Sequence, residues 1–256
     1  MRAPWLFPLL LLPLPCLSCG SLDAAKRSGE PDTSSVAASP LPWNGTWVPP
    51  EDWATMPPAD FERLVLAALP DGTRTLLEKP TRIELGAALD RMDTSSVRAA
   101  VILGRCATEQ AGNILFRRLQ RRVLGPSRES DAGDVLAAAA LARFPRPERW
   151  HKIARLAIGA NPHPDLEVRV ECAITALSLG DERTIDFLLA VMRIGTIEGL
   201  DDELDFTPSQ TTAWARGRAA EALSAYAGLP LRYRADAPIA DRERETRRLA
   251  EALGAR

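Results

Sequence analysis

The chain has 256 residues, of which 46% are apolar and 26% are charged. This length and composition are ordinary for a soluble globular protein with one sizeable core, even after a leader and a linker are subtracted. The formal net charge of -2 gives no reason to expect a nucleic-acid partner or strong attraction to a membrane surface.

Residues 1–19 are predicted to be a signal peptide. Arg2 provides a short positive region, and residues 5–17 form an apolar run of the length expected in such a peptide. A membrane-spanning helix is the alternative. Two features disfavour a spanning helix. The run contains prolines, each of which costs a helix interior ~3 kcal/mol, and it is shorter than the ~20 residues that a bilayer crossing needs. We therefore expect export.

The sequence CLSCG at residues 16–20 resembles a bacterial lipobox, in which a small residue precedes the cysteine that receives lipid. Ser18 before Cys19 fits this pattern, whereas Cys16 stands where the family usually has leucine. The resemblance implies that a lipidated Cys19 anchors the protein to a membrane. Gly20 after it favours the outer membrane of a Gram-negative cell, with the protein facing the periplasm. A periplasmic or secreted protein without lipid is the alternative.

Residues 20–57 are predicted to be a flexible linker that ends in a Trp- and Pro-rich segment. Serine, alanine and proline dominate residues 23–42, as in a tether. Trp43, Trp47 and Trp53 follow among several prolines, so this part is expected to be extended or turn-like. The rings either cover the apolar end of the domain that follows or form a docking strip for a partner or a sugar.

Residues 58–256 are predicted to form a helical domain. Apolar residues at helical spacing indicate a first helix over 59–69 and a second over 82–92. The apolar positions of the second helix are Ile83, Leu85, Leu89 and Met92. A last helix over 237–252, with alternating Arg and Glu, is expected to be a solvated cap.

Between these ends, one pattern occurs four times. Units start at residues 97, 132, 168 and 214, at intervals of 35, 36 and 46 residues, which suit helical repeats of ~33–47 residues. Each unit carries an apolar or small residue five and nine positions after its start. The predicted core pairs are Ile102 and Cys106, Ala137 and Leu141, Ala173 and Leu177, and Ala219 and Leu223.

Residues 165–192 contain one complete unit. An acidic N-cap precedes Val168 and Arg169, Gly180 and Asp181 break the first helix, and a second helix turns back. This unit resembles a HEAT or HEAT-like repeat. The resemblance implies an all-α fold, a right-handed α-solenoid of about four to five HEAT-like helix pairs, whose stacked helices present an extended surface to another protein.

The longest interval contains the first candidate for partner binding. Residues 196–212 are inserted between repeats and include four neighbouring acidic residues, Asp201, Asp202, Glu203 and Asp205. Insertions in helical-repeat proteins lie in loops on one face, often the binding face. A solvated loop and a Ca²⁺ site remain alternatives, although the spacing of an EF-hand is missing.

A set of arginines is the second candidate for partner binding. Arg117, Arg118, Arg121 and Arg122 lie on one predicted helix. Guanidinium groups pair with carboxylates and phosphates, so this ridge suits an acidic protein or anionic lipid headgroups. A charged outer face without a partner explains the same pattern.

No constellation of residues predicts catalysis, a cofactor or a metal. His151 and His163 have no second ligand at metal-binding spacing, and His163, between two prolines, is expected at the surface. Cys106 and Cys172 fall on core positions two repeats apart, too far for a disulfide, so we expect buried free thiols.

The predicted function is that of a protein-interaction scaffold at the cell envelope, with an unidentified protein partner and no enzymatic activity. Two alternatives stay open. Some HEAT-like families resemble phycobilin lyases, which attach or detach a tetrapyrrole on cysteine, but that work is cytoplasmic. An envelope protein that binds a glycan or another ligand through Trp43, Trp47 and Trp53 is the other.

Overall fold

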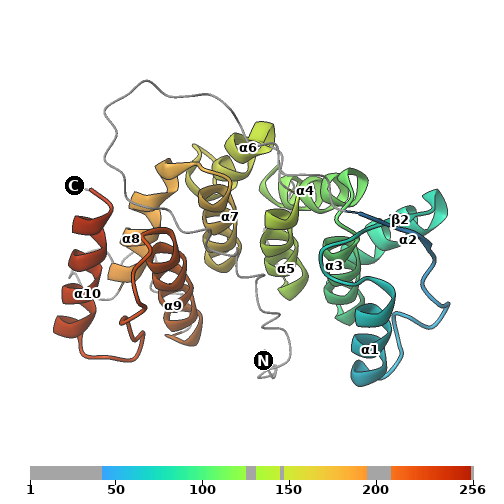
Figure 1. Cartoon of the computed structure of the whole chain (residues 1–256), viewed down its shortest axis with the longest axis horizontal. Coiled ribbons are helices and arrows are strands. Elements are labelled where there is room, and N and C mark those ends of the chain that lie inside the picture. The colour runs from blue at the N-terminus through green and yellow to red at the C-terminus, as the bar shows by residue number, and fades with distance from the viewer. Residues whose placement is uncertain (1–41, 125–130, 145–146, 195–208, 255–256) are drawn as a thin grey trace. The chain divides into compact units, whose positions relative to one another are not determined.

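The computed structural model describes residues 42–124, 131–144, 147–194 and 209–254. Cys19 and the acidic residues Asp201, Asp202, Glu203 and Asp205 lie outside these ranges. The described elements are, in chain order (Figure 1), β1 (Trp43–Trp47), α1 (Pro58–Ala68), β2 (Arg74–Leu77), α2 (Lys79–Leu89), α3 (Thr94–Cys106), α4 (Glu109–Leu124), α5 (Ala132–Ala140), η2 (Leu141–Arg143), α6 (Pro147–Ile158), α7 (Leu166–Ser178), η3 (Glu182–Thr184), α8 (Ile185–Arg193), α9 (Ser209–Tyr226) and α10 (Ile239–Ala252). Helices dominate, as the predicted all-α class requires.

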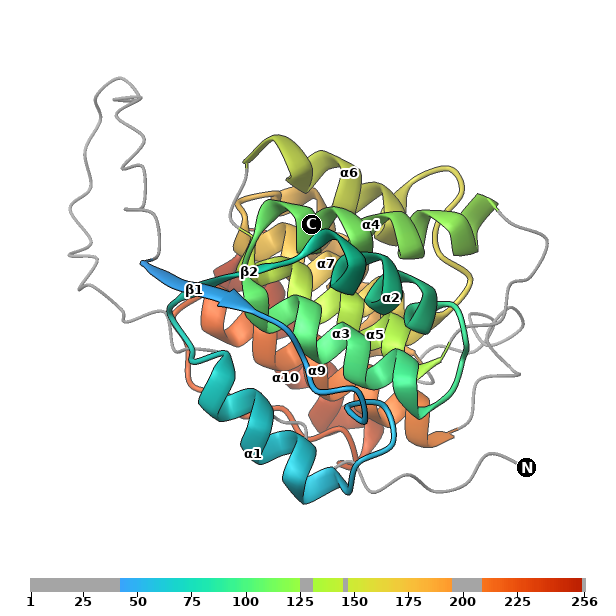
Figure 2. The same ribbon diagram turned by 90° about the vertical axis from the view of Figure 1, so that its right-hand side faces the viewer.

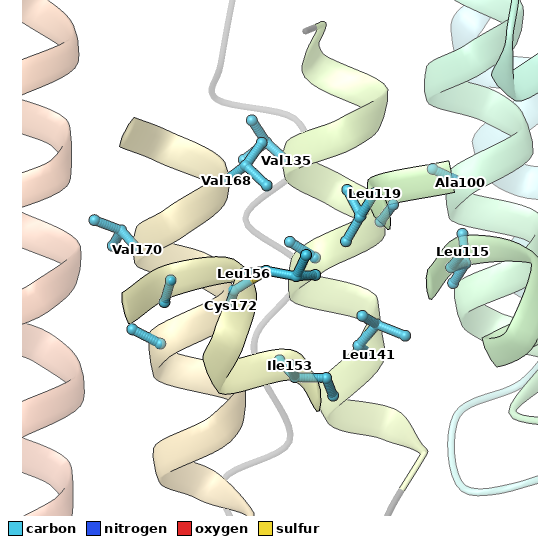
Figure 3. Packing of buried hydrophobic residues seen from close by; sticks show 14 of the residues in the cluster. Ala100, Leu115, Leu119, Val135, Leu141, Ile153, Leu156, Val168, Val170 and Cys172 are labelled. Atoms are coloured by element: carbon cyan, nitrogen blue, oxygen red, sulfur yellow. The ribbon is translucent and has the colours of Figure 1, made fainter. Parts of the chain in front are cut away.

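The core follows the repeated sequence pattern. All eight residues predicted as core pairs of the four units are at most 3% exposed. The partner helices also turn their apolar faces inward, and Leu115 and Leu119 of α4 and Ile153 of α6 are buried. Figure 3 shows side chains from α4, α5, α6 and α7 meeting in this core. The helical periodicity therefore identified the buried faces correctly.

The first helices of the units form one row, in which α3 packs on α5, α5 on α7 and α7 on α9. The second helices pack back on it: α4 lies against α3 and α5, α6 against α7, and α8 against α9 (Figures 1 and 2). Small residues let the axes of neighbouring helices in the row approach closely. A Cβ atom added at Gly104 of α3 would lie 2.7 Å from the Cβ of Ala140 in α5.

The Trp-rich segment packs on the first helices. Strand β1 pairs in parallel with β2, which joins this segment to the first helices (Figure 2). Trp53 is 2% exposed and donates its Nε1–H to Glu84 at 2.8 Å. The covering role thus holds for Trp53, whereas Trp43 is 59% exposed beside Arg74.

Two expectations at the ends of the domain need correction. Met92 lies beyond the end of α2, with a φ of 56°, and Ile83 points outward with 63% exposure. Helix α10 is not solvated all round, because Arg242, Thr246 and Leu249 are buried where it packs on α8 and α9. Within the described ranges no helix is both long and apolar enough for a bilayer crossing.

Candidate functional site

An open groove lies between α2 and α4, which are neighbours in Figures 1 and 2. Its volume is about 1030 Å³. Three apolar side chains line it: Ile83 and Leu124, which are 63% and 82% exposed, and the half-buried Ile114. Its charged lining consists of one carboxylate, Asp90, and six cations: Lys79, Arg82, Arg117, Arg118, Arg121 and Arg122. We call this feature the basic groove.

The helical repeat explains how these cations face one another. Lys79 and Arg82 are three residues apart on α2 and therefore share a side of it. On α4, Arg117 and Arg121 form one stripe with four-residue spacing, and Arg118 and Arg122 form the neighbouring stripe. Because Leu115 and Leu119 face the core, the second stripe is drawn inward and the first remains outside.

The prediction of an exposed ridge of four arginines is wrong for Arg118. Its side chain is 3% exposed, its Nε–H donates to Asp134 at 2.7 Å, and its Nη1–H donates to Asp90 at 2.8 Å. Burial disfavours the charge on Arg118, but the two carboxylates outweigh this effect and raise its pKa. Arg118 therefore joins α4 to α5 and to the end of α2, and it is not available to a partner.

The Asp134 carboxylate that holds Arg118 is itself buried, with 1% exposure. Burial raises the pKa of Asp134, and the Arg118 guanidinium opposes this rise. Asp134 also closes a capping box with Asp131 at the start of α5. Arg122 is 12% exposed and lies 3.6 Å from Asp134, so it too belongs mainly to the interior.

The cations of the groove outside the buried stripe have few partners among the described residues; Lys79, Arg117 and Arg121 are exposed, and Arg82 is half-buried. Lys79, Arg82 and Arg117 make no ion pair with any residue that the structure describes. Arg121 is 60% exposed, and its Nη1 lies 3.1 Å from Asp90 Oδ2. It therefore shares the Asp90 carboxylate with Arg118. The groove therefore concentrates positive charge on a protein whose net charge is negative, and such a field attracts and orients an anionic partner.

The position of His163 between two prolines suggested a place at the surface. That expectation is wrong, because its side chain is buried, with 1% exposure. Its turn folds back because the His163 N–H donates to Leu156 O at 2.7 Å, while Nδ1 accepts from Asp165 N–H at 3.2 Å. Burial lowers its pKa to about 4, and the nearby Arg122 and Arg118 add to this effect while Asp165 opposes it.

The two described cysteines, Cys106 and Cys172, are free and buried, as predicted. Burial raises the pKa of Cys106 to about 12 and raises that of Cys172 as well. Such thiols are poor nucleophiles, because the thiolate is the reactive form. Among the residues placed by the structure, no group of three or more His, Cys, Asp or Glu side chains is arranged to hold a metal.

The aromatic strip does not form as one surface. Trp43 is exposed under Arg74, whose guanidinium carbon lies 4.5 Å from the ring centre, Trp47 is half-buried, and Trp53 is inside. A sugar-binding platform made of all three rings would need Trp53 at the surface. Of the three residues, Trp43 is the one that the structure leaves exposed, with Arg74 over its ring.

The groove contains two cations that sequence reasoning missed, Lys79 and Arg82. Their three-residue spacing was visible in the sequence, but nothing in it indicated that α2 lies beside α4. What the groove can do chemically is recognition, since guanidinium and ammonium groups form charge-assisted bonds with carboxylates.

Comparison with known proteins does not assign the chain to a family. No protein-family model matches the sequence, no curated protein matches it, and no solved structure matches the fold.

Proposed function

We propose that this protein is a HEAT-like helical-repeat scaffold of the cell envelope that binds another protein through the basic groove. The proposal includes a right-handed α-solenoid of about four to five helix pairs, an exported chain, a lipid anchor at Cys19 and no enzymatic activity. The row of α3, α5, α7 and α9, each packed on the next, supports the repeat architecture.

The groove's uncompensated charge is the observation that carries the binding proposal. Three of its cations lack an ion pair among the described residues, and exposed apolar side chains flank them. Protein interfaces combine such an apolar contact with charged groups that set register and association rate. A concave surface on a chain of net charge -2 suits a segment of polypeptide better than a flat anionic bilayer.

Site-specific photo-crosslinking in the producing cells tests the binding surface. A photo-crosslinking amino acid replaces Gln120, which is exposed in the groove, and in a matched control it replaces Glu251, which is exposed on α10. We expect a discrete crosslinked protein only from position 120, and we expect Arg117→Glu to abolish it. No adduct, or the same adducts from both positions, would refute a groove-specific partner.

The intact mass of the membrane-fraction protein tests the address separately. In a Gram-negative host, we expect a chain that begins at an acylated Cys19, and we expect Cys19→Ser to remove that species. An unprocessed chain in the cytoplasm would contradict the envelope location and would bring the enzyme alternative back.

A further inference from the structure

We propose that the basic groove of one copy binds the acidic insertion, residues 196–212, of a second copy, so that copies associate head to tail. This inference rests on the groove being a protein-binding surface, as proposed above. It also names the partner: the same chain. The groove is fully described; of the insertion, Ser209–Thr212 form the start of α9, and residues 196–208 enter only through their sequence.

The insertion complements the groove in charge and in apolar content. It contains no lysine or arginine, and its acidic residues are Glu198, Asp201, Asp202, Glu203 and Asp205. Ile197, Leu200, Leu204 and Phe206 alternate with them. The groove offers cations that have no carboxylate partner among the described residues, beside the exposed Ile83 and Leu124. Each surface therefore supplies what the other lacks.

The groove of the same chain lies near the limit of the insertion's reach. It runs from the end of α8 to the start of α9, and residues 195–208 separate the described ends. Even fully extended, its middle lies no further than about 25 Å from those ends. From α9, the path to α4 crosses α7 and α5, three packed steps of about 8–10 Å each, which is comparable to this reach (Figure 1). A second copy can bring its insertion to the groove without this constraint.

Two different surfaces that bind each other make a heterologous contact. Each copy then has one groove and one insertion to offer, so association continues by adding copies at the ends unless the rotation closes a ring. This property separates the proposal from a two-fold dimer, in which both copies use the same patch.

Sedimentation velocity of the full chain tests the proposal. The parent carries Cys19→Ser, so that lipid does not hold copies together. The groove variant adds Lys79→Glu and Arg117→Glu, and the insertion variant adds Asp201→Asn, Asp202→Asn and Glu203→Gln. The matched control is Lys152→Glu with Arg155→Glu, which reverses an exposed Lys and Arg on α6.

We expect the parent and the control to associate as concentration rises, and less so in high salt. Each binding variant alone should associate ~100-fold more weakly. An equimolar mixture of the groove and insertion variants should restore association but stop at dimers, since only one intact groove and one intact insertion can then meet. Identical thermal melting of all four proteins would show that folding is unchanged.

Several results would overturn the inference. A monomeric parent, an insertion variant that associates like the parent, or a mixture that forms no dimers would each do so. Binding of the parent to phosphatidylglycerol vesicles, lost only in the groove variant, would assign the groove to lipid. If position 120 crosslinks a different protein while the parent stays monomeric, self-association fails and the scaffold proposal stands; no crosslink at all would remove both.

Discussion

Neighbouring residues of α4 have opposite roles. Arg117 is exposed without an ion pair among the described residues, whereas Arg118 is buried between Asp90 and Asp134. In the sequence the two are equivalent members of an arginine-rich helix, and nothing local distinguishes them. Their difference depends on α5, which places a buried carboxylate against one stripe of α4 only.

Replacement of Arg118 should therefore destabilise the fold. Arg118→Leu leaves the Asp134 carboxylate buried without its main partner, which costs about 3–5 kcal/mol. Arg117→Leu, the matched control, should change the free energy of unfolding by no more than ~0.5 kcal/mol. Urea denaturation measures both. Equal effects would mean that the buried pair does not hold α4 to α5.

His163 should make stability depend on pH. Its folded pKa of about 4 lies below the unfolded value of ~6.5, so its contribution to stability is complete above pH 6.5. As pH falls from 6.5 to 4, His163 becomes protonated in the unfolded chain but not in the folded chain. The free energy of unfolding therefore falls by roughly 3 kcal/mol.

His163→Gln should remove this part of the pH dependence, whereas His151→Gln, at an exposed position, should keep it. Urea unfolding at pH 7 and pH 4.5 measures the difference. Parallel profiles for the parent and His163→Gln would show that His163 is protonated equally in both states.

At the scale of elements, two arginines fix the start of a unit to the segment before it. Arg98 of α3 donates to Trp53 O and Met56 O and lies over Phe61, and Arg169 of α7 donates to Ala157 O at 3.0 Å. Arg169 also lies over a phenylalanine, Phe187, at 4.8 Å. Burial lowers the pKa of both guanidinium groups. The Val-Arg pairs of the sequence pattern therefore mark junctions between segments.

Removing one such junction should weaken the domain. Arg169→Ala deprives the Ala157 carbonyl of its charged donor and should cost about 1.5–3 kcal/mol. Arg155→Ala, on the exposed side of α6, is the control and should be nearly neutral. Thermal unfolding followed by circular dichroism checks this. A neutral Arg169→Ala would leave α6 and α7 held by apolar packing alone.

The close approach of α3 and α5 should make Gly104 indispensable. Alanine favours a helix over glycine by ~1 kcal/mol, but a Cβ at position 104 would lie 2.7 Å from that of Ala140. Overpacking of this kind costs about 1–3 kcal/mol. Gly104→Ala should thus lower the melting temperature, whereas Gly217→Ala, with open space around it, should raise it. A rise in both would show that the helices separate freely.

At the scale of the whole molecule, the sequence was most informative about what repeats. The offsets of five and nine residues found Ile102, Leu177 and six further core residues correctly, because helical periodicity is local and one face of each helix is buried. Which helices become neighbours is not local. The pairing of β1 with β2, the burial of His163 and the arrival of Lys79 and Arg82 opposite α4 all depend on tertiary packing, and single-segment patterns do not encode it.

The row of α3, α5, α7 and α9 has a mechanical consequence. In the part of the chain that the structure describes, the main contacts within the row join successive members, so the row contains three junctions in series. A rotation of a few degrees at each junction adds to the others, while every pair of helices keeps its own contacts. We therefore expect the row to respond to load as an elastic element, with a change in the spacing between the α2–α4 end and the α8–α9 end and no loss of core.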